Sequence, residues 1–121
     1  MISLTSAVRV FVYKEPCSMH SSFEKLTALT RNQIKQEPTS GHLFLFLNKN
    51  RTSVKILYFD RSGYVIWYKK LEAGTFSRPE EGEIDYRQLS CVLEGIEEKR
   101  IVKKKRYFIG KNEENVMPAV T

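Results

Sequence analysis

The sequence predicts a single α+β domain in which an antiparallel β-meander packs with two α-helices. Three apolar runs are separated only by short polar turns, which forces neighbouring strands to run antiparallel. Two other segments carry apolar residues at helical spacing behind a capping motif. The chain has 121 residues, the length of one domain. We assign residues 1–98 to that domain and residues 99–121 to a basic C-terminal segment and flexible tail.

The first strand is expected over residues 8–13, which are rich in β-branched and aromatic side chains and precede Pro16. A helix is expected next, over residues 20–36. Its start is indicated by Ser21-Ser22-Phe23-Glu24, which has the form of a capping box, and Pro38 prevents a longer helix.

The meander follows. Its expected strands are His42-Leu43-Phe44-Leu45-Phe46-Leu47, Val54-Lys55-Ile56-Leu57-Tyr58-Phe59 and Tyr64-Val65-Ile66-Trp67-Tyr68-Lys69-Lys70. The turn between the last two is Asp60-Arg61-Ser62-Gly63. A second, shorter helix is expected from Asp85 to Glu94, because Asp85-Tyr86-Arg87-Gln88 can form a capping box and Gly95 can end the helix.

Alternation assigns the meander side chains to two faces, once Phe59 is paired with Tyr64 and Leu47 with Val54. One face holds His42, Phe44, Phe46, Lys55, Leu57, Phe59, Tyr64, Ile66 and Tyr68; the other holds Leu43, Leu45, Leu47, Val54, Ile56, Tyr58, Val65, Trp67 and Lys69. Both faces are apolar, whereas an antiparallel sheet normally leaves one face to water. The first helix can cover one face. The second helix, a dimer partner or a functional partner must cover the other, and Trp67 is expected to be largely buried.

The chain is basic. Its 20 Lys and Arg residues against 14 Asp and Glu residues give a net charge of +6 and a pI of about 9.4. With 41% hydrophobic residues the composition is that of a globular protein, which excludes a disordered acidic chain. The positive charge favours anionic partners, nucleic acid first.

Motifs for catalysis, metal binding or membrane insertion are missing from the sequence. Cys17 and Cys91 form no C-x-x-C pair, and Cys17 with His20 is only half of a metal-site spacing. Neither a Gly-rich phosphate loop nor a nucleophile elbow occurs. No signal peptide and no membrane-spanning apolar run is found. We therefore expect a reduced, cytoplasmic, non-enzymatic protein without metal, cofactor or membrane contact.

Basic residues interleaved with aromatic ones are the candidate nucleic-acid contacts, because lysines neutralise phosphates and aromatic faces stack bases. The candidates are Lys49, Arg51, Lys55, Lys69, Lys70, Lys103, Lys104, Lys105 and Arg106. Two alternatives stay open. Aromatic residues in strands ordinarily form the core, with lysines as a soluble rim, and a basic tail can be only solubilising.

An ordered set of short motifs carries a family resemblance. In the first half of the chain these are Val8-Arg9-Val10, Met19 before Phe23-Glu24, and Ser40-Gly41-His42-Leu43-Phe44. In the second half they are Lys55-Ile56-Leu57-Tyr58-Phe59-Asp60, Tyr68-Lys69-Lys70-Leu71-Glu72 and Gly74-x-Phe76-x-x-Pro79. The chain in this way resembles, from about residue 2 to about residue 96, the TnpB-type accessory protein encoded by the second reading frame of insertion sequence 66 family elements.

The resemblance implies a bacterial accessory protein of DNA transposition, encoded beside a separate, larger transposase, with no catalytic residues to carry over. Two mechanisms stay open. In the first, the protein binds element DNA through the candidate residues. In the second, it is an assembly module without direct DNA contact, which docks on the transposase, on another accessory subunit, or on a second copy as a homodimer.

Overall fold

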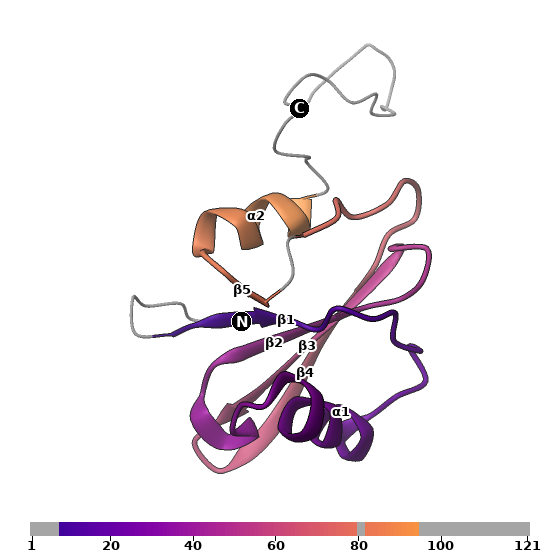
Figure 1. The fold of residues 1–121 in the computed structure, drawn as a ribbon. Helices are drawn as coiled ribbons and strands as arrows, with labels where there is room; N and C mark the ends of the chain where they lie inside the picture. Colours follow the sequence, from indigo (N-terminus) through magenta and orange to yellow (C-terminus); the bar gives the residue numbers. More distant parts are fainter. Residues whose placement is uncertain (1–7, 80–81, 95–121) are drawn as a thin grey trace.

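A five-stranded sheet lies at the centre of the computed structural model, which describes residues 8–79 and 82–94. The strand order is β4-β3-β2-β1-β5 (Figure 1). In chain order the elements are β1 (Val10–Val12), α1 (Phe23–Leu29), the π-helical turn η1 (Thr30–Ile34), the 3-10 turn η2 (Pro38–Ser40), β2 (Leu43–Leu47), β3 (Ser53–Asp60), β4 (Gly63–Lys70), β5 (Gly82–Ile84) and α2 (Tyr86–Glu94). The predicted α+β class is confirmed. The basic segment from residue 99 onward lies outside the described residues.

The meander has the predicted register. Leu47 pairs with Val54 across β2 and β3, and Phe59 pairs with Tyr64 across β3 and β4. The β3–β4 turn contains two residues, of which Arg61 adopts a left-handed φ of 58°. Two-residue turns of this kind match the twist of the strands that they join.

The sheet is mixed, because β1 runs parallel to β2 with Val10 opposite Leu43. This pairing was not predicted from the sequence. A parallel neighbour needs a long crossover, and the segment that contains α1 supplies it. On its other side β1 pairs antiparallel with β5, so the three-residue β5 forms one edge of the sheet and the eight-residue β4 forms the other.

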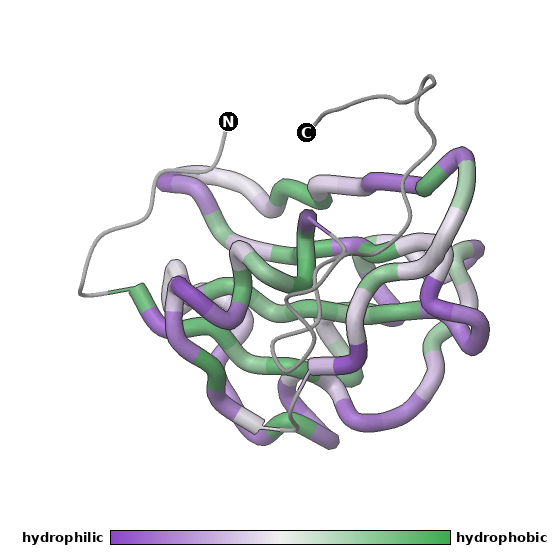
Figure 2. Tube along the Cα trace, turned by 90° about the horizontal axis from the view of Figure 1, so that it is seen from above, coloured by the Kyte–Doolittle hydropathy of each residue, from purple (hydrophilic) through white to green (hydrophobic). Residues whose placement is uncertain are grey.

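Both faces of the sheet are apolar, as alternation predicts, and the chain itself covers both of them. On the face beneath α1, Phe11, Phe44, Phe46 and Leu57 pack with Leu26 of the helix. On the opposite face, the strand residues pack with Leu89 and Val92 of α2, and with Phe76 and Ile84. Figure 1 shows the two helices on opposite sides of the sheet, and Figure 2 shows hydrophobic residues along the strands and hydrophilic ones in the turns. Because α2 and Phe76 cover the face opposite α1, no dimer partner is needed to bury it.

The first helix is shorter and less regular than predicted. α1 ends at Leu29 and continues as a π-helical turn, in which the buried Thr30 hydroxyl donates to the Leu26 carbonyl at 2.8 Å. Such back-bonding by Thr disturbs a regular helix. The predicted capping box is wrong, because the N-cap residue is Ser22 and its side chain makes no capping hydrogen bond.

The second helix has the predicted start. The Gln88 amide donates to Asp85 Oδ1 at 2.8 Å, and the Asp85 amide donates to Gln88 Oε1 at 2.9 Å. This reciprocal pair is a capping box, and it fixes the end of α2 that faces β5. Within the described ranges, no helix is long and apolar enough to cross a membrane.

Trp67 is only partly buried, which corrects the expectation that it is largely buried. It packs against the α2-side cluster, but β4 is an edge strand and leaves part of the indole uncovered. The fully buried aromatic residue on this face is Phe76, from the segment that follows β4.

Candidate nucleic-acid interface

Four chain segments bring basic residues to one end of the sheet. β1 and β2 are parallel and end there, β3 begins there, and the antiparallel β4 ends there. The predicted residues Lys49, Arg51, Lys69 and Lys70 therefore gather at this end. We call it the basic end, and it consists of residues 13–16, 48–52, 69–70 and 78–79.

A hollow of about 160 Å³ opens at the basic end. Its lining residues are Val12, Tyr13, Lys14, Glu15, Pro16, Leu47, Asn48, Lys49, Arg51, Arg78 and Pro79. Four of these side chains are cationic and one is anionic, so the lining carries a net positive charge. Lys14 and Arg78 were not predicted from the sequence, because neither belongs to a basic cluster and only the fold brings them beside Lys49.

Hydrogen bonds within the 48–52 loop fix its conformation. Asn48 Oδ1 accepts from the backbone amides of Thr52 at 2.9 Å and Ser53 at 3.1 Å, and Asn48 Nδ2 donates to Thr52 Oγ1 at 3.0 Å. Through these bonds to groups four and five residues further on, the Asn48 side chain closes the loop. Lys49 lies on this turn with its side chain exposed.

Arg51 joins that loop to the segment after β4. Its Nη1 donates to the Phe76 carbonyl at 2.8 Å, and its own carbonyl accepts from the Phe76 amide at 2.7 Å. Phe76 is buried in the core, so the guanidinium is held at a fixed place on the hollow wall. A guanidinium has five N–H donors, and this hydrogen bond uses one of them.

Tyr13 adds a neutral hydroxyl to the hollow. Its ring packs against Phe46 with centroids 5.6 Å apart. Burial raises the pKa of the phenol, and the charges of Glu15 and Cys17 raise it further. The hydroxyl therefore stays protonated at neutral pH and can donate a hydrogen bond to an anion.

Lys69 and Lys70 lie side by side at the end of β4 and are both exposed. Adjacent strand residues point to opposite faces. Lys69 accordingly points to the α2 side, where its Nζ donates to the Leu93 carbonyl near the end of that helix at 3.4 Å. Lys70 points to the α1 side.

Lys55 has a different environment from the other candidates. It is 9% exposed, and its Nζ donates to the carbonyls of Met19 and Ser21, each at 2.8 Å. The same ammonium lies 5.0 Å from the ring centroid of Tyr68. These contacts occupy the ammonium inside the protein, so we leave Lys55 out of the basic end. The candidates Lys103, Lys104, Lys105 and Arg106 lie outside the described residues.

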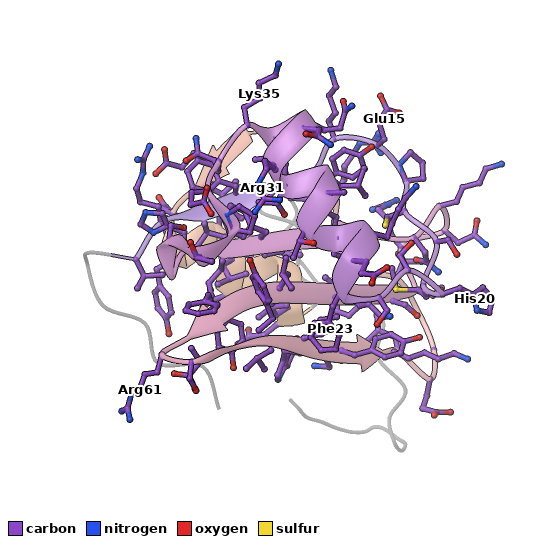
Figure 3. The ribbon with its side chains drawn as sticks, turned by 90° about the horizontal axis from the view of Figure 1, so that it is seen from below. Glu15, His20, Phe23, Arg31, Lys35 and Arg61 are labelled. Atoms are coloured by element: carbon purple, nitrogen blue, oxygen red, sulfur yellow. The ribbon has the colours of Figure 1, made fainter. Side chains whose placement is uncertain are left out.

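The other end of the sheet carries paired charges. Arg9 Nη2 lies 2.8 Å from Glu83 Oε1, and Arg31 pairs more loosely with Glu37 at 3.8 Å. Figure 3 shows Arg61, at the β3–β4 turn, and Glu15, at the basic end, on opposite sides of the molecule. In the part of the chain that the structure describes, neither ion pair involves a cation of the basic end. Nor do the described residues include three His, Cys, Asp or Glu side chains grouped to hold a metal ion.

Comparison with known proteins gives a family match over most of the chain. A family model described as "IS66 Orf2 like protein" matches residues 8–103. The uncharacterized protein y4hO of Sinorhizobium fredii is 31% identical over 94 residues, which are 74% of this chain and 82% of the relative. The uncharacterized protein y4jC of the same organism is 26% identical over 108 residues, 86% of this chain and 92% of the relative. No solved structure matches.

Proposed function

The chain belongs to the family of IS66 Orf2-like proteins, and from that membership we propose that it is a non-catalytic accessory protein of transposition that binds the DNA backbone. The proposed contact surface is the basic end of the sheet. The proposed site of action is the cytoplasm, beside the transposase of the element.

The observation that carries this proposal is the convergence of cations from separate segments of the chain. Lys14, Lys49, Arg51 and Arg78 surround one hollow, and among the described residues that line it Glu15 is the acidic one. A phosphate backbone carries closely spaced negative charges, and most of the affinity of a DNA-binding protein comes from neutralising them. Backbone contacts of this kind position a protein on the duplex without reading its sequence.

The two kinds of cation at this end have different roles. Lys14, Lys49 and Arg78 are exposed and can each follow a phosphate. Arg51 is fixed by the Phe76 carbonyl, so it can offer its remaining donors in one orientation at little entropic cost. Lys69 and Lys70 extend the positive surface along the end of β4, and we propose that residues 103–106 add a further, sequence-independent contact.

The test is a salt titration of duplex binding with full-length variants. Each of Lys14→Gln, Lys49→Gln and Arg78→Gln should lower the slope of log affinity against log salt by roughly 0.9 for each phosphate that the variant no longer neutralises. Arg61→Gln is the matched control, because Arg61 is exposed and lies at the opposite end of the sheet. Binding that is insensitive to salt, or an equal decrease of the slope in the control, would contradict the proposal.

A second experiment separates DNA contact from assembly on the transposase. The tagged protein is recovered from cells that carry the whole element, with and without nuclease treatment. Loss of the transposase after nuclease indicates that DNA holds the two proteins together. Retention of the transposase, combined with a flat salt titration, favours the assembly module without DNA contact.

A further inference from the structure

Two exposed aromatic side chains lie next to the basic end, on the face of the sheet that α1 covers. The large hydrophobic residues exposed in the described part of the chain are Phe23, Tyr68 and Tyr86, at 44%, 50% and 64%. Phe23 is the first residue of α1, and Tyr68 lies two residues before Lys70 in β4. Figure 3, which views the molecule from the α1 side, shows Phe23 at the start of that helix. Neither ring belongs to the two core clusters, so both are open to a ligand.

The buried ammonium of Lys55 fixes the place of both rings. Its Nζ lies 5.0 Å from the centroid of the Tyr68 ring. The same Nζ donates to the carbonyls of Met19 and Ser21, each at 2.8 Å, just before α1 begins at Phe23. One face of the Tyr68 ring is therefore held against a cation inside the protein, and the start of α1 is tied to the same point. Rings that are positioned in advance lose little freedom when a ligand binds them.

The positive charge of the basic end continues directly from these rings. Side chains two residues apart in a strand share a face, so Lys70 lies on the α1 side with Tyr68, their Cα atoms about 7 Å apart. Lys70 is exposed, and within residues 8–79 and 82–94 neither ion pair involves it. The Leu71 amide donates to the Thr52 carbonyl at 2.8 Å, so the end of β4 lies against the loop that carries Lys49.

An exposed ring beside cations matches the chemistry of a nucleotide whose base is free. The base stacks on the ring while phosphates of the same strand meet the lysines, which is how proteins bind single-stranded DNA. In a duplex the neighbouring base pairs cover both faces of each base, so a base must be unstacked to reach an aromatic side chain. An apolar protein partner would use the rings but would leave Lys70 and Lys49 without negative charge opposite them.

We propose that Tyr68 stacks an unpaired base of single-stranded DNA whose backbone crosses the basic end, with Phe23 as a second ring at the start of α1. Lys55 acts here as a positioning residue, because it holds the Tyr68 ring without reaching the DNA itself. This inference rests on the proposed binding of DNA by the basic end. It adds the class of DNA, since a strand with unpaired bases gains stacking contacts that a duplex does not offer.

The test compares a thymidine oligonucleotide with a duplex of the same length, bound by the full-length protein and followed by fluorescence anisotropy. Tyr68→Ala should weaken binding of the single strand roughly 5- to 150-fold and leave the affinity for the duplex unchanged. Tyr68→Phe keeps the ring and should bind both as the wild type does. Tyr86→Ala is the matched control, because Tyr86 is also exposed but begins α2, on the opposite face of the sheet.

Photocross-linking of the wild type locates the stacked base without a substitution. An oligonucleotide that carries one 5-iodouracil should cross-link on irradiation to Tyr68 or Phe23, as peptide mapping shows, and not to Tyr86. Thermal melting checks that Tyr68→Ala folds.

The inference and the proposed function can fail separately. No binding of the single strand, an equal effect of Tyr68→Ala on single strand and duplex, or a cross-link at Tyr86 would overturn the stacking site. The proposed function would still stand if the duplex titration responded to Lys14→Gln, Lys49→Gln and Arg78→Gln. A flat duplex titration would reject the proposed function itself, and the stacking site with it.

Discussion

Substitution of Lys55 by methionine separates its structural role from DNA binding. Methionine keeps most of the apolar stem and removes the ammonium, which donates to the carbonyls of Met19 and Ser21 and lies over Tyr68. Those two carbonyls belong to the loop before α1. Lys55 therefore ties the start of that helix to the middle of β3, and removal of its ammonium should destabilise the domain.

The expected decrease in the free energy of unfolding is about 2 kcal/mol. Hydrogen bonds to a charged group contribute roughly 1.5–3 kcal/mol each, and a cation–π contact roughly 0.5–1 kcal/mol. The ammonium must be desolvated to make these contacts, and that cost cancels roughly half of the gain. A decrease of about 2 kcal/mol lowers the Tm of a domain of this size by about 6–12 °C.

Thermal melting followed by circular dichroism measures the change, with Lys49→Met as the matched control. Lys49 is exposed, so its substitution should stay within about 0.5 kcal/mol of wild type. The salt titration of duplex binding should rank the two variants in the opposite order from the stability measurement. Lys49→Met should lower the slope of log affinity against log salt, and Lys55→Met should leave that slope unchanged. The structural role of Lys55 would be refuted if the Lys55→Met variant melted like wild type and reduced the salt dependence of DNA binding as much as Lys49→Met does.

Two further predictions concern the core and an ion pair. Phe76→Ala should cost about 3–5 kcal/mol in urea unfolding, and Trp67→Ala only about 2 kcal/mol because the indole is partly exposed; equal costs would contradict the placement of Trp67 at the edge. The hydrogen bond from Arg9 holds the pKa of the Glu83 carboxyl below its usual range. Its contribution to stability is therefore present above the usual pKa of a glutamate and disappears as the pH falls through the lowered value. An NMR titration should show this pKa rising in Arg9→Gln; an unchanged value would mean that the pair does not form in solution.

Most of the meander could be predicted because its signals are local. Short turns dictate antiparallel pairing, and once Leu47 is set opposite Val54 every other side chain follows by alternation. The Asp85–Gln88 capping box is equally local. The box predicted at the first helix fails because the Ser21 amide, which the Glu24 carboxylate would have to cap, donates to the Ser18 carbonyl at 3.1 Å, and the N-cap is Ser22, one residue later.

Lys55 also explains why the charge pattern predicts the site only in part. Alternation already places Lys55 on the same face as Phe44 and Phe46, beneath the first helix. Positive charge and aromatic neighbours favour a phosphate contact, but a lysine on a covered face binds whatever oxygens the covering segment presents. Here the loop before α1 presents two carbonyls. Side-chain direction is therefore a better guide to a phosphate contact than charge alone.

The direction of β1 determines which cations gather at one end. Because β1 is parallel to β2, Lys14 leaves the sheet at the same end as Lys49, and the amide of Cys17 donates to the Leu47 carbonyl at 2.9 Å. An antiparallel β1 would carry Lys14 to the end where Arg61 lies. Parallel pairing requires a crossover over one face of the sheet, and α1 with its apolar Leu26 forms that crossover. The helix that covers one core therefore also determines the charge distribution of the proposed DNA-binding surface.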